Sequence, residues 1–222
     1  MRTVLSTKIL TPQQRELFLN SGLGLVEYDA LQIEFLDVVI PESFQYLIFT
    51  SKNAVKAFLR QKKNIEEPEA FSVFCVGEKT KTLLEDFGLK VAKMASNAVE
   101  LALFIAKNYK NESFLFLCGN QRRNELPQFL KENNIRYDEI VVYRTILTPK
   151  KYNRVFDGLL FFSPSGIKSH SSKNPINESW LFCIGETTAN EAGKYSENII
   201  TANKPTVENV LVQAIKKLKV ND

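Results

Sequence analysis

The sequence predicts an α/β protein with two similar lobes, each a parallel sheet flanked by helices. Short apolar runs recur along the 222 residues with helical stretches between them, and most of these runs are continuous rather than alternating. Continuous apolar strands are typical of parallel sheets that are covered on both faces. The segment CVGEKT at 75–80 also matches CIGETT at 183–188 at four of six positions. Such a repeat indicates that one α/β unit is duplicated.

A second pair of segments supports the duplication. LIFTSKNAVK at 47–56 lies over LLFFSPSGIK at 159–168, at an offset of 112 residues instead of 108. A connection that is four residues shorter in the second copy explains the difference. A period near 110 fills the chain twice, and each copy is long enough to bury a core of its own.

The apolar runs are the expected strands. Two longer segments, 30–40 and 137–147, carry many β-branched residues and are expected to be long strands. These two would join the lobes as a two-stranded β connector, with a cleft between the lobes. In chain order the apolar runs are 4–10, 46–51, 71–77, 114–119, 139–147, 158–163 and 180–185.

Helices are expected between the strands. One runs from about Thr80 to Phe87 and ends at Gly88, since glycine readily adopts the left-handed turn at a helix end. Apolar residues spaced i, i+3, i+4, i+7 from Val99 and again from Val207 indicate two amphipathic helices. The segments 4–20 and 116–133 share a looser pattern of strand, polar loop and helix.

Composition and charge exclude several classes of protein. The net charge of +4, from 29 basic and 25 acidic residues, is too small to indicate a nucleic-acid partner and favours at most an anionic small molecule. No apolar run approaches the length that spans a bilayer, and the N-terminus lacks the apolar core of a secretory signal. We therefore expect a cytoplasmic protein without a membrane partner.

Metal, triad and nucleotide chemistry also lack support in the sequence. Cys75, Cys118 and Cys183 do not have the spacing of a zinc site or a redox pair, so we expect reduced, structural thiols. His170 is the only histidine, which argues against a Ser-His-Asp triad and a multi-histidine metal site. The GEKT segment lacks the upstream glycine of a P-loop, and GLG at 22–24 lacks the third glycine of a dinucleotide fingerprint.

Five loops are candidates for ligand binding. Four of them follow strand ends and open helices, at 50–53, 77–80, 163–166 and 185–188, and a fifth at 118–123 carries two arginines. Ligands of open α/β sheets bind at the carboxyl ends of the strands, where helix N-termini present unpaired amides that suit carboxylates or phosphates. Arginines add bidentate contacts to carboxylates. Together the loops predict a site for an anionic ligand.

Each of these loops also has a purely structural interpretation. Ser, Thr and Asn are the commonest helix N-caps, so their side chains would be there in a protein that binds nothing. Arg122 and Arg123 fit a solvated helix start, and the repeated Glu78 and Glu186 fit the favourable end of a helix dipole. Tyr143 is either a packed sheet aromatic or a functional phenol. The presence of five loops at equivalent sheet edges favours the binding interpretation.

The order of seven segments resembles the uroporphyrinogen-III synthase family. They are IFTSKNAV, VGEKT, LCGNQRRNELP, VVYRT, FFSPSG, IGETTA and KPTVENVL, and they span almost the whole chain. The resemblance implies one lobe formed by 1–35 plus 150–222, a second lobe formed by 41–138, and connecting strands at 36–40 and 139–149. The duplication would then be interlaced rather than laid out half by half.

The resemblance implies a lyase of tetrapyrrole (haem) biosynthesis that uses no metal or organic cofactor. Its reaction closes hydroxymethylbilane, a linear tetrapyrrole, to uroporphyrinogen III with loss of water and inversion of the last ring, ring D. The substrate is a flexible polyanion, because every pyrrole carries acetate and propionate groups. The resemblance also implies a monomer that makes transient contact with the preceding enzyme of the pathway.

The resemblance further assigns roles to residues. Tyr143 matches a tyrosine that faces the cleft in the family, and its phenol would donate a hydrogen bond to the departing hydroxyl. Glu78 and Glu186 depart from the family pattern, and we expect both to point outwards because a carboxylate in the cleft would repel the substrate. The residues expected to bind substrate lie in the five loops: Ser51, Lys52, Asn53, Gly77, Thr80, Gly119, Asn120, Arg122, Ser163, Ser165, Gly166, Gly185, Thr187 and Thr188.

Two other classes of protein fit the same loops. A noncatalytic two-lobed binding protein would use the cleft to hold an anionic metabolite without chemistry. A regulatory domain descended from the synthase would be expected to lose Tyr143 or the FFSPSG loop, and both are present.

Overall fold

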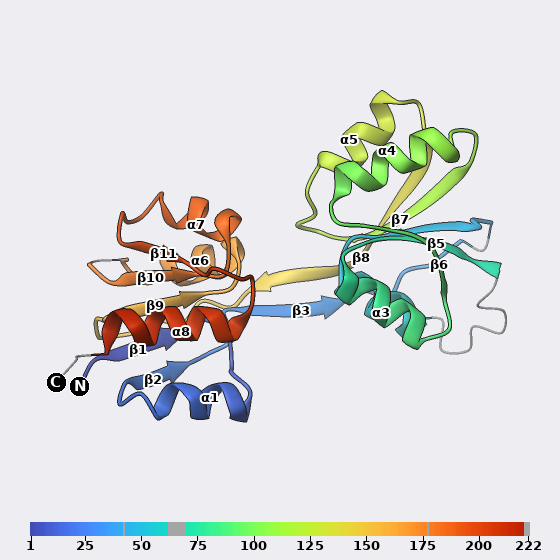
Figure 1. Ribbon diagram of the computed structural model, residues 1–222. Helices are drawn as coiled ribbons and strands as arrows, with labels where there is room; N and C mark the ends of the chain where they lie inside the picture. Colours follow the sequence, from blue (N-terminus) through green and yellow to red (C-terminus); the bar gives the residue numbers. More distant parts are fainter. Residues whose placement is uncertain (42, 62–69, 177, 220–222) are drawn as a thin grey trace. The chain divides into compact units, whose positions relative to one another are not determined.

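The computed structural model describes residues 1–41, 43–61, 70–176 and 178–219. The chain divides into two compact units. Unit 1 contains Met1–Gln32 and Ile146–Asp222, and unit 2 contains Ile33–Thr145. Each unit is a sheet with helices on both faces, parallel except for the edge strand β3 of unit 2, which runs antiparallel to its neighbour (Figure 1).

Unit 1 has a five-stranded sheet in the order β11-β10-β9-β1-β2, in which all paired strands are parallel. The chain leaves this unit early and returns to it for its last third. Its elements are β1 (Thr3–Ser6), α1 (Pro12–Leu19), β2 (Gly24–Glu27), β9 (Gly158–Phe161), α6 (Pro164–Ser171), β10 (Trp180–Cys183), α7 (Glu186–Ala192), β11 (Ile199–Thr201) and α8 (Val207–Leu218).

Unit 2 has a six-stranded sheet in the order β3-β8-β7-β4-β5-β6. The chain passes between the units within its β3 and β8 strands, which are neighbours in this sheet. The elements are β3 (Leu31–Phe35), β4 (Tyr46–Phe49), α2 (Lys52–Gln61), β5 (Ser72–Val76), α3 (Glu78–Asp86), β6 (Lys90–Ala95), α4 (Ala98–Asn108), β7 (Ser113–Gly119), α5 (Glu125–Glu132) and β8 (Arg136–Leu147).

The strand orders match between the units once equivalent strands are aligned. The repeated segments place β5 over β10 and β4 over β9, and the orders β6-β5-β4-β7-β8 and β11-β10-β9-β1-β2 then coincide. β3 is the additional edge strand of unit 2. The predicted parallel α/β fold and its duplication are therefore confirmed.

Three strands were absent from the sequence prediction: β2, β6 and β11. Each lies at an edge of its sheet and is only partly buried. An edge strand has a neighbour on one side alone, so it does not need the continuous apolar run that the prediction relied on. The strand predicted at 30–40 is also shorter, because β3 ends at Phe35.

Helices cover both faces of each sheet (Figure 1), and an apolar layer lies between the sheet and the helices on each face. In unit 2, one layer joins the sheet to α2 and α3 through side chains such as Phe58 and Leu84, and the other joins it to α4 and α5 through Leu101 and Leu130. In unit 1 the corresponding layers contain α6 with α7, and α1 with α8. Successive β4 residues alternate between the two layers, as the pleat requires.

The cysteines belong to these layers. Cys75, Cys118 and Cys183 are free and buried. Burial raises the pKa of the Cys75 thiol to about 11 and of the Cys118 and Cys183 thiols to about 12, so all three stay protonated at neutral pH. The prediction of structural thiols is confirmed.

The repeated glycines of the two matching segments have different backbone requirements. Gly77 has φ +85° and ψ 140°, a conformation that side chains rarely adopt, whereas Gly185 has extended backbone at φ −179°. Neither Cβ would meet an atom within 4 Å, so the backbone alone decides the effect of a substitution. We expect Gly77→Ala to lower the free energy of unfolding by about 1–3 kcal/mol. Gly185→Ala, the matched control, should leave it unchanged or raise it by up to about 1 kcal/mol, as measured by urea unfolding.

The lone histidine should make unit 1 sensitive to acid. His170 is 2% exposed on α6, and burial lowers the pKa of its imidazole from 6.5 to about 4. Between these values the unfolded chain binds a proton that the folded chain does not, so stability falls as the pH falls from about 6.5 to about 4. The loss amounts to roughly 3 kcal/mol. His170→Gln should remove this component, so its unfolding free energy should fall less than that of the wild type between pH 6.5 and pH 4. If the unfolding free energies of the two proteins fell equally over this range, His170 would not be the cause.

Candidate functional site

A cavity of about 420 Å³ lies at the carboxyl ends of the strands of unit 2. Its walls come from the ends of β4, β5, β7 and β8 and from the loops that follow β6 and β7. Because these strands are parallel, their carboxyl ends meet at one edge of the sheet, where α/β proteins bind ligands. Side chains and backbone that line it include Ser51, Asn97, Gly119, Arg122, Arg123 and Tyr143.

Tyr143 lines this cavity from strand β8. Its ring packs against the apolar layer of the sheet on one side, and the side chain is half-buried. Its hydroxyl is 3.1 Å from the hydroxyl of Ser51, which follows β4. The phenol therefore has an apolar support, one polar partner and an opening to the cavity.

Gly119 is required by this placement of the tyrosine. A Cβ atom at position 119 would lie 2.3 Å from Cζ of Tyr143 and 2.7 Å from its hydroxyl oxygen. Real side chains never approach so closely, so only glycine leaves room for the ring. Gly119 thus contributes space for the phenol in addition to its own main-chain N–H and carbonyl groups.

The loop after β7 is hydrogen-bonded to the strand that carries Tyr143. The backbone N–H of Asn120 donates to the carbonyl of Tyr143 at 3.2 Å, and the N–H of Thr145 donates to Oδ1 of Asn120 at 2.9 Å. Nε2 of Gln121 donates to the carbonyl of Thr145 at 3.4 Å. The side chain of Asn120, a predicted substrate ligand, therefore holds the loop in place.

Arg122 forms an ion pair inside the unit. Its Nε lies 2.9 and 2.8 Å from the two carboxylate oxygens of Glu139, and its Nη1 donates to Asn124 at 3.2 Å. The hydrogen bond to Glu139 raises the pKa of the guanidinium, which stays charged. Arg122 lines the cavity, and it also fixes the start of the loop that leads into α5.

Several lining residues were not among the predicted site residues, including Asn97, Arg123 and Glu125. Asn97 caps α4, with its Oδ1 accepting from the N–H of Glu100 at 2.9 Å, while Glu100 accepts from the N–H of Ser96 at 3.0 Å. This capping pattern places the N-terminus of α4 on the cavity wall. Arg123 also lines the cavity. The Asn-x-x-Glu spacing was the available sequence signal for Asn97.

The other predicted residues of unit 2 do not line this cavity. Lys52 is exposed and Asn53 half-buried at the start of α2. Gly77 begins α3 and offers no side-chain cap, and Thr80 is only 5% exposed.

The predicted loops of unit 1 also lie at the carboxyl edge of their own sheet. Ser163 caps α6, with its Oγ accepting from the N–H of Gly166 at 3.1 Å. Thr188 is 2% exposed, as buried as its counterpart Thr80. Ser165 is half-buried, Gly185 begins α7, and Thr187 is exposed. Glu78 and Glu186 are both exposed.

Thr7 is a unit 1 residue that sequence reasoning missed. It is buried directly after β1, and its Oγ1 donates to the carbonyl of Leu160 at 2.7 Å. A Cβ on Gly166 would lie 3.5 Å from this oxygen, so Thr7 and the α6 N-terminus are neighbours. The Ser6-Thr7 pair at the end of an apolar run was the only signal.

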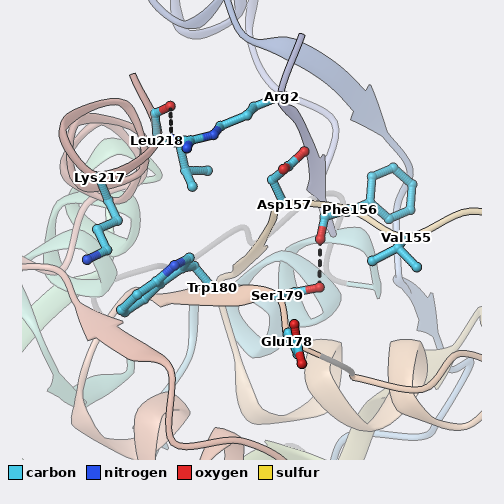
Figure 2. A pocket seen from close by; sticks show the side chains of 9 residues that line it. All are labelled: Arg2, Val155, Phe156, Asp157, Glu178, Ser179, Trp180, Lys217 and Leu218. Atoms are coloured by element: carbon cyan, nitrogen blue, oxygen red, sulfur yellow. Dashed lines mark hydrogen bonds between the residues drawn. The ribbon is translucent and has the colours of Figure 1, made fainter. Parts of the chain in front are cut away.

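A larger hollow of about 590 Å³ lies at the amino ends of the unit 1 strands and contains none of the predicted residues (Figure 2). Two of its charged groups already have partners: Arg2 donates to the carbonyl of Leu218 at 2.9 Å, and Asp157 accepts from the N–H of Thr3 at 2.8 Å. Nζ of Lys217 lies 3.8 Å from the centre of the Trp180 ring. We therefore assign the candidate site to the carboxyl edge in unit 2.

No metal site accompanies the cavity within the described ranges. Among those residues, no three His, Cys, Asp or Glu side chains come together in a way that could hold an ion. In the same part of the chain, no helix is long and apolar enough to cross a bilayer.

Comparison with known protein families assigns the chain to a family. Residues 14–211 match the sequence model of the family described as uroporphyrinogen-III synthase HemD. The chain belongs to this family. The match extends over parts of both units and includes all five loops that the sequence singled out as candidates for ligand binding.

Relatives agree with the family assignment. The porphyrin biosynthesis protein HemD of Ruminiclostridium josui is 24% identical over 220 residues, which cover 86% of this chain and 43% of that protein. The chain thus spans less than half the length of the curated relative. The crystal structure of uroporphyrinogen-III synthetase from Helicobacter pylori matches with a TM-score of 0.76 and 22% identity, over 98% of this chain and 100% of that one. A mutant uroporphyrinogen III synthase from Thermus thermophilus matches with a TM-score of 0.72 and 12% identity, over 98% of each chain.

Proposed function

We propose that this member of the uroporphyrinogen-III synthase family catalyses the reaction of its family name. It would close hydroxymethylbilane to uroporphyrinogen III, releasing water and inverting ring D. The observation that carries the proposal is the placement of Tyr143 on the wall of a cavity whose rim includes Arg123 and the N-terminus of α4. One phenol donor thus lies next to groups that attract carboxylates.

The electrostatics of the cavity suit a polyanion. The guanidinium group of Arg123 and the amino end of α4 supply positive potential to the lining, while the charge of Arg122 is paired with Glu139 and one carboxylate, Glu125, also lines the cavity. The exposed Glu78 and Glu186 do not line it. In this proposal, Arg123 and the α4 amides bind acetate or propionate groups, and Arg122 shapes the loop through its pair with Glu139.

The proposed role of Tyr143 is to assist the departure of the hydroxyl group of ring A. The carbon–oxygen bond breaks with its electron pair going to oxygen, which leaves as water after it receives a proton, and the ring becomes an electrophilic azafulvene. The substituted carbon of ring D then attacks, and the spiro intermediate fragments and recloses with ring D turned round. A positioned phenol lowers the barrier of the first step by donating to the departing oxygen.

The main contribution of the protein to the later steps is conformational. Unassisted closure gives the uninverted type I isomer, so the site must hold the chain ends in the less accessible approach. The remaining predicted ligands are proposed to do this through hydroxyl and main-chain groups at the carboxyl edges: Lys52, Asn53, Gly77, Thr80, Gly119, Asn120, Ser163, Ser165, Gly166, Gly185, Thr187 and Thr188.

The proposal includes the class of enzyme and its setting. The protein would be a cofactor-independent lyase that acts as a cytoplasmic monomer. Free hydroxymethylbilane closes to the type I isomer without assistance. Transient contact with the enzyme that supplies it would therefore reduce the amount of type I isomer that forms.

The experiment is an isomer assay with freshly prepared hydroxymethylbilane. The purified chain is mixed with the substrate, the products are oxidised to porphyrins, and the type I and type III isomers are separated. A predominance of type III supports the proposal, and type I at the spontaneous rate would refute it. Binding of the tetrapyrrole without a change in isomers would identify a binding protein instead.

A further inference from the structure

The hydrogen-bond arrangement around Ser51 distinguishes this serine from a simple helix cap. Its Oγ accepts from the backbone N–H of Ala54 at 3.1 Å, as an N-cap oxygen does. The same Oγ lies 3.1 Å from the hydroxyl of Tyr143, on a strand 92 residues away in sequence. Ser51 therefore links the start of α2 to the phenol at the cavity.

Counting hydrogens assigns a direction to this link. A serine hydroxyl has one hydrogen to donate and two lone pairs that accept, and a tyrosine hydroxyl also has one hydrogen. Ala54 occupies one lone pair of Ser51. Within the described residues, the Tyr143 oxygen is the one acceptor in reach of the Ser51 hydrogen. Donation from Ser51 to Tyr143 uses that hydrogen and leaves the tyrosine hydrogen for the cavity.

In the opposite direction, Tyr143 would have no hydroxyl hydrogen left to donate into the cavity. If Tyr143 donated to Ser51, its only hydrogen would be held inside the protein and the serine hydrogen would have no acceptor among the described residues. In the favoured direction, three donors follow one another: the Ala54 N–H, the Ser51 O–H and the Tyr143 O–H. Aligned hydrogen bonds polarise one another, so this order strengthens the last donor of the chain.

We propose that Ser51 is a positioning residue, which directs the hydroxyl hydrogen of Tyr143 into the cavity and strengthens it as a donor. Ser51 does this without contacting the reacting atoms. The proposal rests on the proposed function, because it gives the phenol its direction in the step where the ring A hydroxyl departs. It replaces the expectation that the Ser51 side chain binds substrate directly.

The test is a double-mutant cycle between the two hydroxyls. Ser51→Ala should lower kcat by about 10-fold and change KM by less than about twofold, because a transition-state donor is weakened while ground-state binding is not. Ser51→Thr keeps a hydroxyl and should recover most of the rate. In a Tyr143→Phe background, Ser51→Ala should cause no further loss of kcat, since the group it acts through is gone.

A matched variant separates this role from a loss of stability. Thr206 caps α8, with its hydroxyl accepting from the N–H of Asn209 at 3.2 Å, and it lies outside the cavity. Thr206→Ala should lower the unfolding midpoint about as much as Ser51→Ala and leave kcat unchanged. Equal losses of kcat from Ser51→Ala in both backgrounds, or no loss in either, would overturn the proposal.

The same assays distinguish a failure of the proposed role of Ser51 from a failure of the proposed function. If wild-type enzyme forms the type III isomer and Tyr143→Phe retains full kcat, the positioning role of Ser51 fails while the proposed function stands. If wild-type enzyme gives only type I, the proposed function itself fails.

Discussion

Tyr143→Phe is expected to lower kcat for formation of the type III isomer by about 100-fold or more. The change removes the one phenol donor proposed for the departing hydroxyl and keeps the ring that packs over Gly119. Loss of its hydrogen bond with Ser51 should cost only about 1 kcal/mol of stability. KM should change little, since the interaction is proposed for the transition state. Initial rates with separated isomers measure the effect.

Tyr137→Phe is the matched control for this variant. Tyr137 lies on the same strand, its hydroxyl donates to the carbonyl of Pro127 at 3.4 Å, and it does not line the cavity. This variant should keep wild-type kcat. Full activity in Tyr143→Phe would remove the catalytic role of the phenol, and an equal loss in both variants would attribute the effect to the strand rather than to the site.

Gly119→Ala is expected to damage both stability and activity. The added methyl would lie 2.3 Å from Cζ of Tyr143, so the ring must leave its position. Overpacking of this kind costs about 1–3 kcal/mol of stability. Displacement of the phenol should also lower kcat by at least about 10-fold, because small misplacements of a catalytic group are costly. Urea unfolding and initial rates measure the two effects separately.

The cause of the Gly119 effect can be isolated with a second substitution. In a Tyr143→Ala background the ring is absent, so the alanine at 119 should cost little additional stability. An undiminished cost in that background would show that the backbone at 119, and not the tyrosine ring, requires glycine.

The fold could be predicted from the sequence because the central strands are buried on both faces. β4, β5, β7, β9 and β10 are continuous apolar runs, and the repeated loops fixed which of them correspond. The edge strands β2, β6 and β11 carried no such signal, since each is only partly buried. Burial, rather than strand formation as such, is what the apolar pattern reports.

The candidate site was predicted less completely. Tyr143, Gly119 and Ser51 were each expected at the site, and the structure brings them together because β8, β7 and β4 are successive neighbours in the sheet. That order could not be derived from spacing in the chain. The pairing of Arg122 with Glu139 likewise depends on the pairing of β7 with β8. Arg122, which was expected to bind substrate, therefore also holds the loop after β7 against β8.

The repeated glycines and threonines also have a structural explanation that needs no ligand. Thr80 and Thr188 are both buried next to the helix starts, with backbone N–H groups that donate to Gly77 and Gly185 at 3.0 Å. Packing of a strand–turn–helix corner explains the repeat without a ligand. Their proposed contact with substrate rests on main-chain groups, which a side-chain pattern cannot localise.

The isomer ratio tests the central claim most directly. Purified chain, treated with EDTA, is added in increasing amounts to freshly made hydroxymethylbilane, and the fraction of type III product is followed against a sample without protein. If the chain is a synthase, the type III fraction should rise with protein concentration until nearly all of the product is type III, and the reaction should be faster than spontaneous closure. A product that remains type I at every protein concentration would contradict the account.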